Sequence, residues 1–136
     1  MTALVDALQA ALAGEDAAVW ACGRAAGELS GDQRSAALDE LDVHRQNRDS
    51  LQARIVAQGA APGQAAPAYV EPFPVTGAKT ARRLLAHVND ALTATYADVV
   101  AASAPATRGL DLTAGIDAAR RAVGWGAAPS AFPGSG

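Results

Sequence analysis

Acid, imidazole and guanidinium groups gather at helical spacing in one stretch of this 136-residue chain, in a sequence otherwise dominated by alanine. Glu40, His44 and Arg48 are separated by four residues each, so in an α-helix they lie one turn apart on one face. Arg45 and Asp49 form a second pair at this spacing. Carboxylates and imidazoles bind iron, manganese or zinc, whereas a guanidinium can neutralise buried carboxylates without a metal. The chemistry of the stretch therefore depends on whether this face is buried.

The spacing of apolar residues around this stretch predicts that part of it faces the core. Alternating steps of four and three residues trace one seam along the helix, as on a packed helix face. The members of this seam are Ala37, Leu41, His44, Arg48, Leu51, Ile55 and Gln58. His44 and Arg48 therefore interrupt an apolar stripe, and burying them requires partners because unpaired charges are costly inside proteins.

The first helical segment supplies a partner of the right kind. Its apolar residues recur in steps of three and four, and Glu15 is the only charged residue on that seam. We therefore predict a buried polar network in which Arg48 donates to the Glu15 carboxylate and His44 completes the set. Glu40, one turn before His44, belongs to the same predicted network.

Composition restricts both the fold class and the function. Alanine, the strongest helix former, supplies 36 residues, which favours an all-α chain with one domain over residues 1–136. A net charge of −3 with a single lysine predicts no nucleic-acid binding. No apolar run approaches the roughly 20 residues of a membrane span, and the first residues lack a basic leader, so we expect no membrane association and a cytoplasmic location.

Glycine, proline and polar residues divide the chain into helical segments. The predicted helices cover about residues 2–29, 32–58, 77–103 and 105–124. The connection at residues 60–76 contains four prolines and should cross the bundle, held in place by Tyr69 and Phe73. In the tail at 125–136, Phe132 is expected to dock onto the bundle. The predicted core seam of the last helix is Leu112, Ile116, Ala119 and Val123.

Two antiparallel helices, a long crossover and two further helices describe an up-down four-helix bundle with ferritin-like connectivity. The motifs LAGEDAAVW at residues 12–20, HRQNRD at 44–49, PAYVEPFPV at 67–75 and FPG at 132–134 support this interpretation. Through them the chain resembles an uncharacterised, alanine-rich ferritin-like family of high-GC bacteria. The resemblance spans nearly the whole chain, and it implies a homodimer but no established activity.

The ligand set of a two-metal ferritin-like bundle is only partly present. Such bundles use one glutamate from each of two helices and a Glu-x-x-His pair from each of the other two. Glu15 suits the first helix, but the residue three positions before His44 is Leu41, and Glu40 is one position too early. In the third helix Asn89 stands where the resemblance implies a glutamate.

The last helix completes this comparison. It contains no histidine, and its only carboxylates belong to Asp111 and Asp117. A complete set of dimetal ligands is therefore absent. The sequence also lacks a nucleophile beside a histidine and an acid, so we expect no catalytic residues and no cofactor.

Three hypotheses follow for the function. The first is a non-catalytic ferritin-like domain in which the polar network replaces the metal centre, and which acts through dimerisation or binding of an unidentified protein partner. The second is an iron- or manganese-dependent oxidoreductase or metal-binding protein using Glu15 and His44, with Glu40 as a further ligand of a mononuclear site. The third is a small-ligand cavity between the helices, capped by Arg48.

Other chemically distinctive side chains have simpler predicted roles. Cys22 is the only cysteine, so no internal disulfide can form, and we expect it in the core. Trp20 and Trp125 are predicted at the core or at a dimer interface. His87 lies on a partly polar face and is expected to be solvated.

Overall fold

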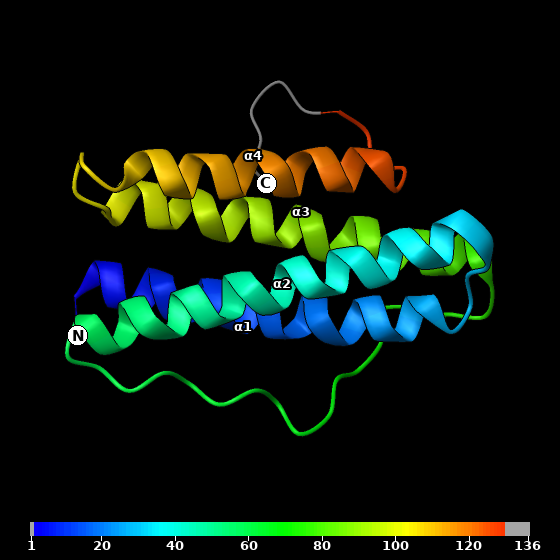
Figure 1. Cartoon of the computed structure of the whole chain (residues 1–136), viewed down its shortest axis with the longest axis horizontal. Helices are drawn as coiled ribbons and strands as arrows, with labels where there is room; N and C mark the ends of the chain where they lie inside the picture. Colours follow the sequence, from blue (N-terminus) through cyan, green and yellow to red (C-terminus); the bar gives the residue numbers. More distant parts are fainter. Residues whose placement is uncertain (1, 130–136) are drawn as a thin grey trace.

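The computed structural model describes residues 2–129, and this part of the chain contains α-helices and no strand. The helices are α1 (Ala3–Ala26), α2 (Gly31–Ala57), α3 (Ala78–Ala102) and α4 (Arg108–Gly124), as labelled in Figure 1. The prediction of an all-α four-helix bundle is confirmed. Phe132, which was expected to dock onto the bundle, lies outside the described residues.

Local sequence signals explain where the helices begin and end. The Thr2 hydroxyl caps α1 by accepting a hydrogen bond from the backbone N–H of Val5, at 3.2 Å. Gly59 follows α2 with φ +80°, a left-handed conformation that glycine adopts without strain. Residues 104–107 form a turn, so α4 begins at Arg108 rather than at the predicted residue 105.

The helices follow one another along the long axis of the bundle in alternating directions, apart from α2 and α3. In Figure 1, α1 runs antiparallel to α2 and to α3, and α3 runs antiparallel to α4. Because α2 and α3 point the same way, the segment between them must travel back along the bundle, and residues 60–76 do so on the outside of α1 and α2. This long crossover is the connection that the proline-rich stretch predicted.

Helix packing leaves two helices at the outside of the bundle. The helix α1 packs against α2 and α3, and α3 also packs against α4. Close backbone contacts between α2 and α4 are absent from the described residues. Side chains therefore make the connections between these outer helices, and polar ones such as Arg54 of α2 and Asp111 of α4 do so at 2.6 Å.

Small residues on α1 allow this close packing. Ala11, Ala18, Ala21 and Ala25 have no exposed surface, and large apolar side chains from the neighbouring helices fill the space around them. The largest apolar side chains that are almost completely buried are Leu8, Leu12, Ile55, Leu84, Leu85, Leu92 and Val99. Within this apolar core, α1, α2 and α3 each carry buried polar side chains.

The crossover is held against the helices by its aromatic residues. The Tyr69 ring stacks on Trp20 of α1 with ring centroids 5.4 Å apart. The Phe73 ring lies under the Arg83 guanidinium, 4.1 Å from the ring centroid. Near the start of the crossover, the Gln9 side chain bonds to the backbone of Ala61 and Gly63, at 2.8 Å each. The crossover is thus fixed at several points along its length.

The predicted core seam of α4 is wrong by one position around the helix. The residues of α4 that face the core are Asp111, Ala118 and Ala122, whereas Leu112, Ile116 and Val123 are 50, 45 and 43% exposed. Small residues suit the inner face because α4 approaches α3 closely: a Cβ added at Gly115 would lie 3.4 Å from the Tyr96 Cβ. The large apolar side chains of α4 consequently point outwards.

None of the helices within residues 2–129 combines the length and the apolar character needed to cross a membrane.

Arg24 provides a test of how the crossover is held. Its guanidinium donates to the Glu71 carboxylate at 2.7 Å and to the Val75 carbonyl at 2.6 Å. We expect Arg24→Ala to release residues 60–76 and to increase their rate of proteolysis, with little change in the unfolding of the helices. Limited proteolysis with mass spectrometry measures this directly. A cleavage pattern identical to that of the wild type would show that Arg24 does not hold the crossover in place.

The same contact predicts the pH dependence of the crossover. Hydrogen bonds from Arg24 and from the Val75 N–H lower the pKa of Glu71 below its usual value of 4.5. A lowered pKa contributes stability above the unfolded pKa, and this contribution disappears as the pH falls through the folded pKa. Protection of the crossover should therefore persist at neutral pH and decrease only below about pH 4.5. Glu71→Gln should remove most of this pH dependence.

Candidate functional site

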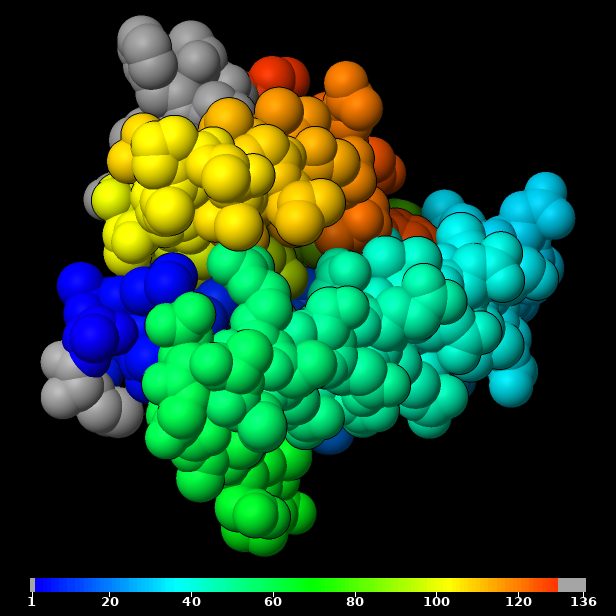
Figure 2. All heavy atoms as spheres, turned by 60° about the vertical axis from the view of Figure 1, so that its left-hand side comes forward, coloured from blue at the N-terminus to red at the C-terminus, as the bar shows by residue number. Residues whose placement is uncertain are grey.

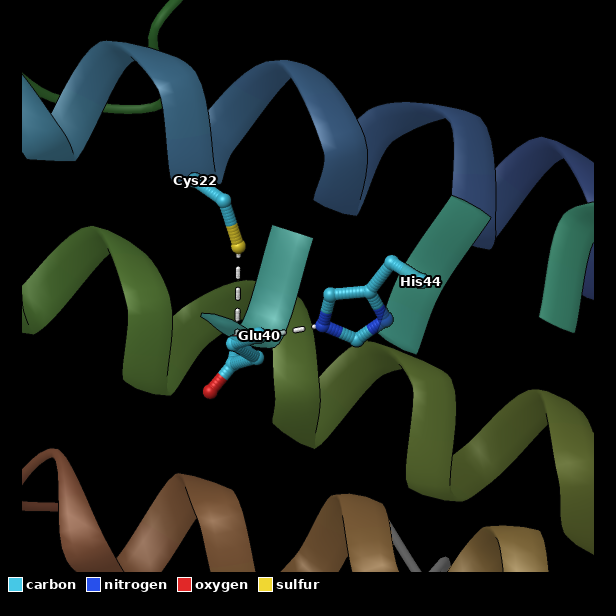
Figure 3. Close-up of side chains that lie close together, drawn as sticks. All are labelled: Cys22, Glu40 and His44. Carbon is cyan, nitrogen blue, oxygen red and sulfur yellow. Dashed lines mark hydrogen bonds and ion pairs between the residues drawn. The ribbon is translucent and has the colours of Figure 1, made fainter. Parts of the chain in front are cut away.

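Polar side chains from all parts of the bundle meet in its centre. Glu15, Cys22, His44 and Asn89 have no exposed surface, and Glu40 is only 7% exposed. Figure 3 shows Cys22 of α1 with Glu40 and His44 of α2, and both the Cys22 thiol and the His44 ring point towards the Glu40 carboxylate. We call this set, together with the residues bonded to it, the polar centre.

His44 lies between two buried carboxylates. Its Nδ1 is 2.6 Å from Glu15 Oε2, and its Nε2 is 3.0 Å from Glu40 Oε2. A neutral imidazole has only one N–H, so donation to both carboxylates requires the doubly protonated ring. Burial alone would lower the pKa of His44, but the hydrogen bonds to both carboxylates raise it above its usual value. The two carboxylates thus favour the protonated form of the His44 ring.

Glu40 accepts hydrogen bonds from several elements at once. Besides His44, its Oε2 accepts from Asn89 Nδ2 at 3.0 Å and from the Cys22 thiol at 3.5 Å. Its Oε1 accepts from Trp125 Nε1 at 2.8 Å. Burial would raise the pKa of Glu40, but the hydrogen bonds from His44, Trp125 and Asn89 lower it overall. The polar centre thus holds Glu40 as a carboxylate.

Glu15 is similarly satisfied. Its Oε1 accepts from Tyr96 OH at 2.8 Å and from Asn47 Nδ2 at 3.1 Å. Burial and the neighbouring Glu15 charge raise the pKa of Tyr96, which keeps the phenol protonated as a donor. The Glu15 carboxylate is therefore surrounded by donors from α2 and α3.

A guanidinium balances the remaining negative charge. Arg121 of α4 donates from Nε to Asn89 Oδ1 at 3.1 Å, and Asn89 in turn donates to Glu40. With Glu15 and Glu40 ionised and His44 and Arg121 protonated, the net charge of the polar centre is zero. The buried Nη2 atom of Arg121 has no hydrogen-bond partner within the described residues.

The structure brings together three of the four residues of the predicted network. Glu15, Glu40 and His44 are in contact, but the expected contact between Arg48 and Glu15 is absent. Arg48 instead pairs with the adjacent Asp49 at 3.0 Å near the surface. The physical reason is helical phase: Asn47 rather than Arg48 faces the core, and Arg121 supplies the guanidinium.

Sequence reasoning missed several members of the polar centre. Cys22 was assigned to the core only, although it lies seven residues after Glu15 and thus on the same seam. Tyr96 follows Asn89 by seven residues, which places both on one face of α3. Trp125 was predicted at the core or at a dimer interface but not in this network, and Arg121 gave no usable signal. The contacts of both depend on how α4 is placed against the other helices.

Three side chains of the polar centre lie close enough together to act as ligands of one metal ion. Cys22, Glu40 and His44 each offer one ligand atom, and these atoms all lie within 4.8 Å of one another. Burial, and next the Glu40 carboxylate, raise the pKa of the Cys22 thiol, so the thiol is protonated in this arrangement. The two carboxylates of α4 lie elsewhere: Asp111 pairs with Arg54 at 2.6 Å, and Asp117 lies 3.9 Å from Arg120.

Arg48 does not cap a cavity between the helices, as the small-ligand hypothesis required. It lines an open depression at the surface between α2 and the crossover, together with Asp16 and Gln52. The nearby polar centre is instead closed by contacts among its own side chains. The geometry thus gives no support to the small-ligand hypothesis at this position.

Comparison with known proteins agrees with this architecture. Residues 7–136 match the family described as a domain of unknown function (DUF4439). The structure is similar to the crystal structure of a conserved hypothetical protein from Mycobacterium tuberculosis, with 28% sequence identity and a TM-score of 0.86. The similarity covers 90% of this chain and 94% of that one. Among proteins of curated function, no match is found.

Removing His44 should reveal how strongly the polar centre depends on its cation. In His44→Ala, Glu15 and Glu40 keep their burial but lose the positive charge between them. We expect a loss of about 3–5 kcal/mol in the free energy of unfolding, because an unpaired buried charge is much more costly than an intact pair. Urea unfolding followed by circular dichroism provides the measurement.

Asp42→Ala is the matched control on the same helix. Asp42 forms an exposed ion pair with Arg45 at 3.6 Å, so its removal should change the stability by less than about 1 kcal/mol. Equal losses in His44→Ala and Asp42→Ala would show that the buried network has no special energetic role.

Proposed function

Because this chain belongs to the DUF4439 family, whose description assigns no activity, we propose a function from its own residues: a non-catalytic, ferritin-like domain that acts by self-association. In this proposal the polar centre replaces the metal centre of a ferritin-like bundle. It stabilises the packing of the helices, while the outer face of α4 makes the functional contact. The free thiol of Cys22 is compatible with a cytoplasmic location.

The observation that carries the proposal is the position of His44 between two carboxylates. Metal-binding ferritin-like bundles join carboxylates from different helices through their ions. Here His44 joins Glu15 of α1 to Glu40 of α2, and Asn89 and Arg121 extend the connection to α3 and α4. Protonated side chains thus provide the positive charge that ions provide in a metal centre.

The iron or manganese alternative has weaker support from the geometry. It relied on Glu15 and His44 as ligands, yet both oxygens of Glu15 already accept hydrogen bonds, from His44, Tyr96 and Asn47. Neither α3 nor α4 supplies a second carboxylate–histidine pair to the polar centre. Asn89 faces the centre from α3, and in the half of α4 that carries Arg121 the buried residues are Ala118 and Ala122. Oxygen activation at a dimetal site therefore has too few ligands.

The outer face of α4 supports the self-association part of the proposal. Its outward-facing apolar seam consists of the exposed Leu112, Ile116 and Val123 and the half-buried Ala119, with the alternating four- and three-residue spacing of helices that pair. Figure 2 shows the yellow-to-orange surface of α4 exposed in the upper part of the view. Clusters of exposed apolar residues of this kind are typical of interaction sites.

A second copy of this chain is the partner that fits this seam. The seam itself carries no charge, so two copies can meet without burying like charges. Asp117 and Arg120 flank the seam on the same side. In an antiparallel twofold arrangement, the Asp117 of each copy approaches the Arg120 of the other, which gives two complementary pairs.

A double-mutant cycle tests the network part of the proposal. We expect Glu15→Gln and Tyr96→Phe to show a coupling energy of about 0.5–3 kcal/mol, because their side chains are hydrogen-bonded in the core. Glu15→Gln and Arg48→Gln should be additive within about 0.5 kcal/mol, since Arg48 bonds to Asp49 instead. Chemical denaturation of the wild type, the three single variants and the two double variants gives both coupling energies. Additivity in the Glu15–Tyr96 pair would contradict the network.

Ile116→Glu tests the association surface. A carboxylate in the middle of the seam should convert a dimer into a monomer without lowering the stability of the fold, because Ile116 is already 45% exposed. Sedimentation velocity over a range of concentrations measures the change. Val70→Glu is the control, since Val70 is 95% exposed on the crossover and far from the seam in sequence. A wild-type protein that sediments as a monomer at all concentrations would reject self-association.

A further inference from the structure

We infer that Cys22, Glu40 and His44 form a mononuclear zinc-binding site, with Glu15 as the hydrogen-bond partner that orients His44. This site lies within the polar centre that we propose in place of a two-metal centre, and zinc would take the place of two protons of the metal-free state. The self-association proposed above does not depend on it, and the site differs from the iron or manganese alternative in its ligands. Cys22 becomes a ligand, and Glu15 takes a supporting position behind the imidazole.

The separations of the ligand atoms carry the first step. A tetrahedral zinc ion binds nitrogen or oxygen at about 2.0–2.1 Å and sulfur at about 2.3 Å, so its ligand atoms lie roughly 3.3–3.6 Å from one another. In the polar centre, Cys22 Sγ is 3.5 Å and His44 Nε2 is 3.0 Å from Glu40 Oε2. All three ligand atoms lie within 4.8 Å of one another. An ion placed among them would replace the hydrogen bonds that His44 and Cys22 make to Glu40 Oε2, while Asn89 and Trp125 would still donate to the Glu40 carboxylate (Figure 3).

The second step is the environment of His44. Histidine ligands of zinc generally donate their other ring N–H to a carboxylate or carbonyl, which fixes the ring and its tautomer. Here Nδ1 is 2.6 Å from Glu15 Oε2, which leaves Nε2 directed towards Glu40. Tyr96 and Asn47 hold Glu15 in this position through its other oxygen. The supporting contacts of a zinc-bound histidine are thus already in place.

Charge balance provides the third step. Zinc binding releases two protons to solvent, one from the Cys22 thiol and one from the His44 imidazolium, and no electron is transferred. The thiolate, the Glu40 carboxylate and the neutral imidazole then neutralise the divalent ion. The two released protons carry the same charge as the divalent ion, so the exchange leaves the net charge of the polar centre unchanged.

The ligand set also selects the metal. A thiolate ligand favours zinc over manganese and magnesium, which prefer oxygen ligands. The carboxylate and the imidazole are also common zinc ligands. The three protein ligands leave the fourth tetrahedral position of the ion without a ligand from this set. Cobalt(II) prefers similar ligands and reports them spectroscopically, which makes it a suitable probe.

The test uses the full-length, metal-free protein. We expect Zn(II), titrated in competition with a chromophoric chelator, to bind at one ion per chain. Co(II) should give the near-ultraviolet sulfur-to-cobalt charge-transfer band that requires a thiolate ligand. Glu15→Gln should weaken Zn(II) binding by about 10–100-fold while keeping this band, as expected for a residue that supports a ligand. Cys22→Ser should abolish the band and weaken binding further than Glu15→Gln does.

His87→Ala is the control for adventitious binding, because His87 is the other histidine of the chain and is exposed. Its Zn(II) affinity and Co(II) spectrum should match those of the wild type. Absence of the sulfur-to-cobalt band in the wild type overturns the site even if a variant fails to fold. Unchanged Zn(II) affinity in Cys22→Ser, or loss of binding in His87→Ala, overturns it as well. The stability and sedimentation experiments on metal-free protein decide the proposed function separately.

Discussion

Burial of the Glu15 and Glu40 carboxylates is the constraint on which the rest of this bundle depends. Each carboxylate would be strongly destabilising without donors, and no single helix supplies enough of them. Donors come from α2 through His44, from α3 through Asn89 and Tyr96, and from beyond α4 through Trp125. The carboxylates therefore connect elements that share little backbone contact, above all α2 and the end of α4.

This connection matters because the alanine-rich packing surface of α1 does not by itself fix the axial register of the helices. Alanine side chains on α1 allow close approach, but they have no shape that distinguishes one axial register from the next. Hydrogen bonds at 2.6–3.1 Å between Glu15, Glu40 and their nitrogen and hydroxyl partners are directional and satisfied in one register only. Apolar burial thus provides the driving force for folding, and the polar centre determines how the helices are aligned.

Sequence reasoning succeeded where a feature depends on one segment and failed where it depends on the rotation of a helix. Alanine content, proline positions and aromatic residues were enough to predict four helices and a crossover bearing Tyr69 and Phe73. Each residue turns a helix by about 100°, so an error of one position replaced Asn47 by Arg48. The same error placed the exposed Leu112 and Ile116 in the core. Only tertiary packing, which brings Arg121 and Trp125 to the centre, settles such choices.

The charge of the polar centre also limits what it can bind. Two carboxylates, one imidazolium and one guanidinium sum to zero, and exchange of two protons for one divalent ion preserves this sum. A second divalent ion would need two more acidic ligands. The buried face of α4 offers Ala118 and Ala122, and its Asp111 already pairs with Arg54. With the zinc site proposed above, the polar centre would have ligands and charge for one divalent ion, whereas two-metal ferritin-like bundles use four glutamates and two histidines.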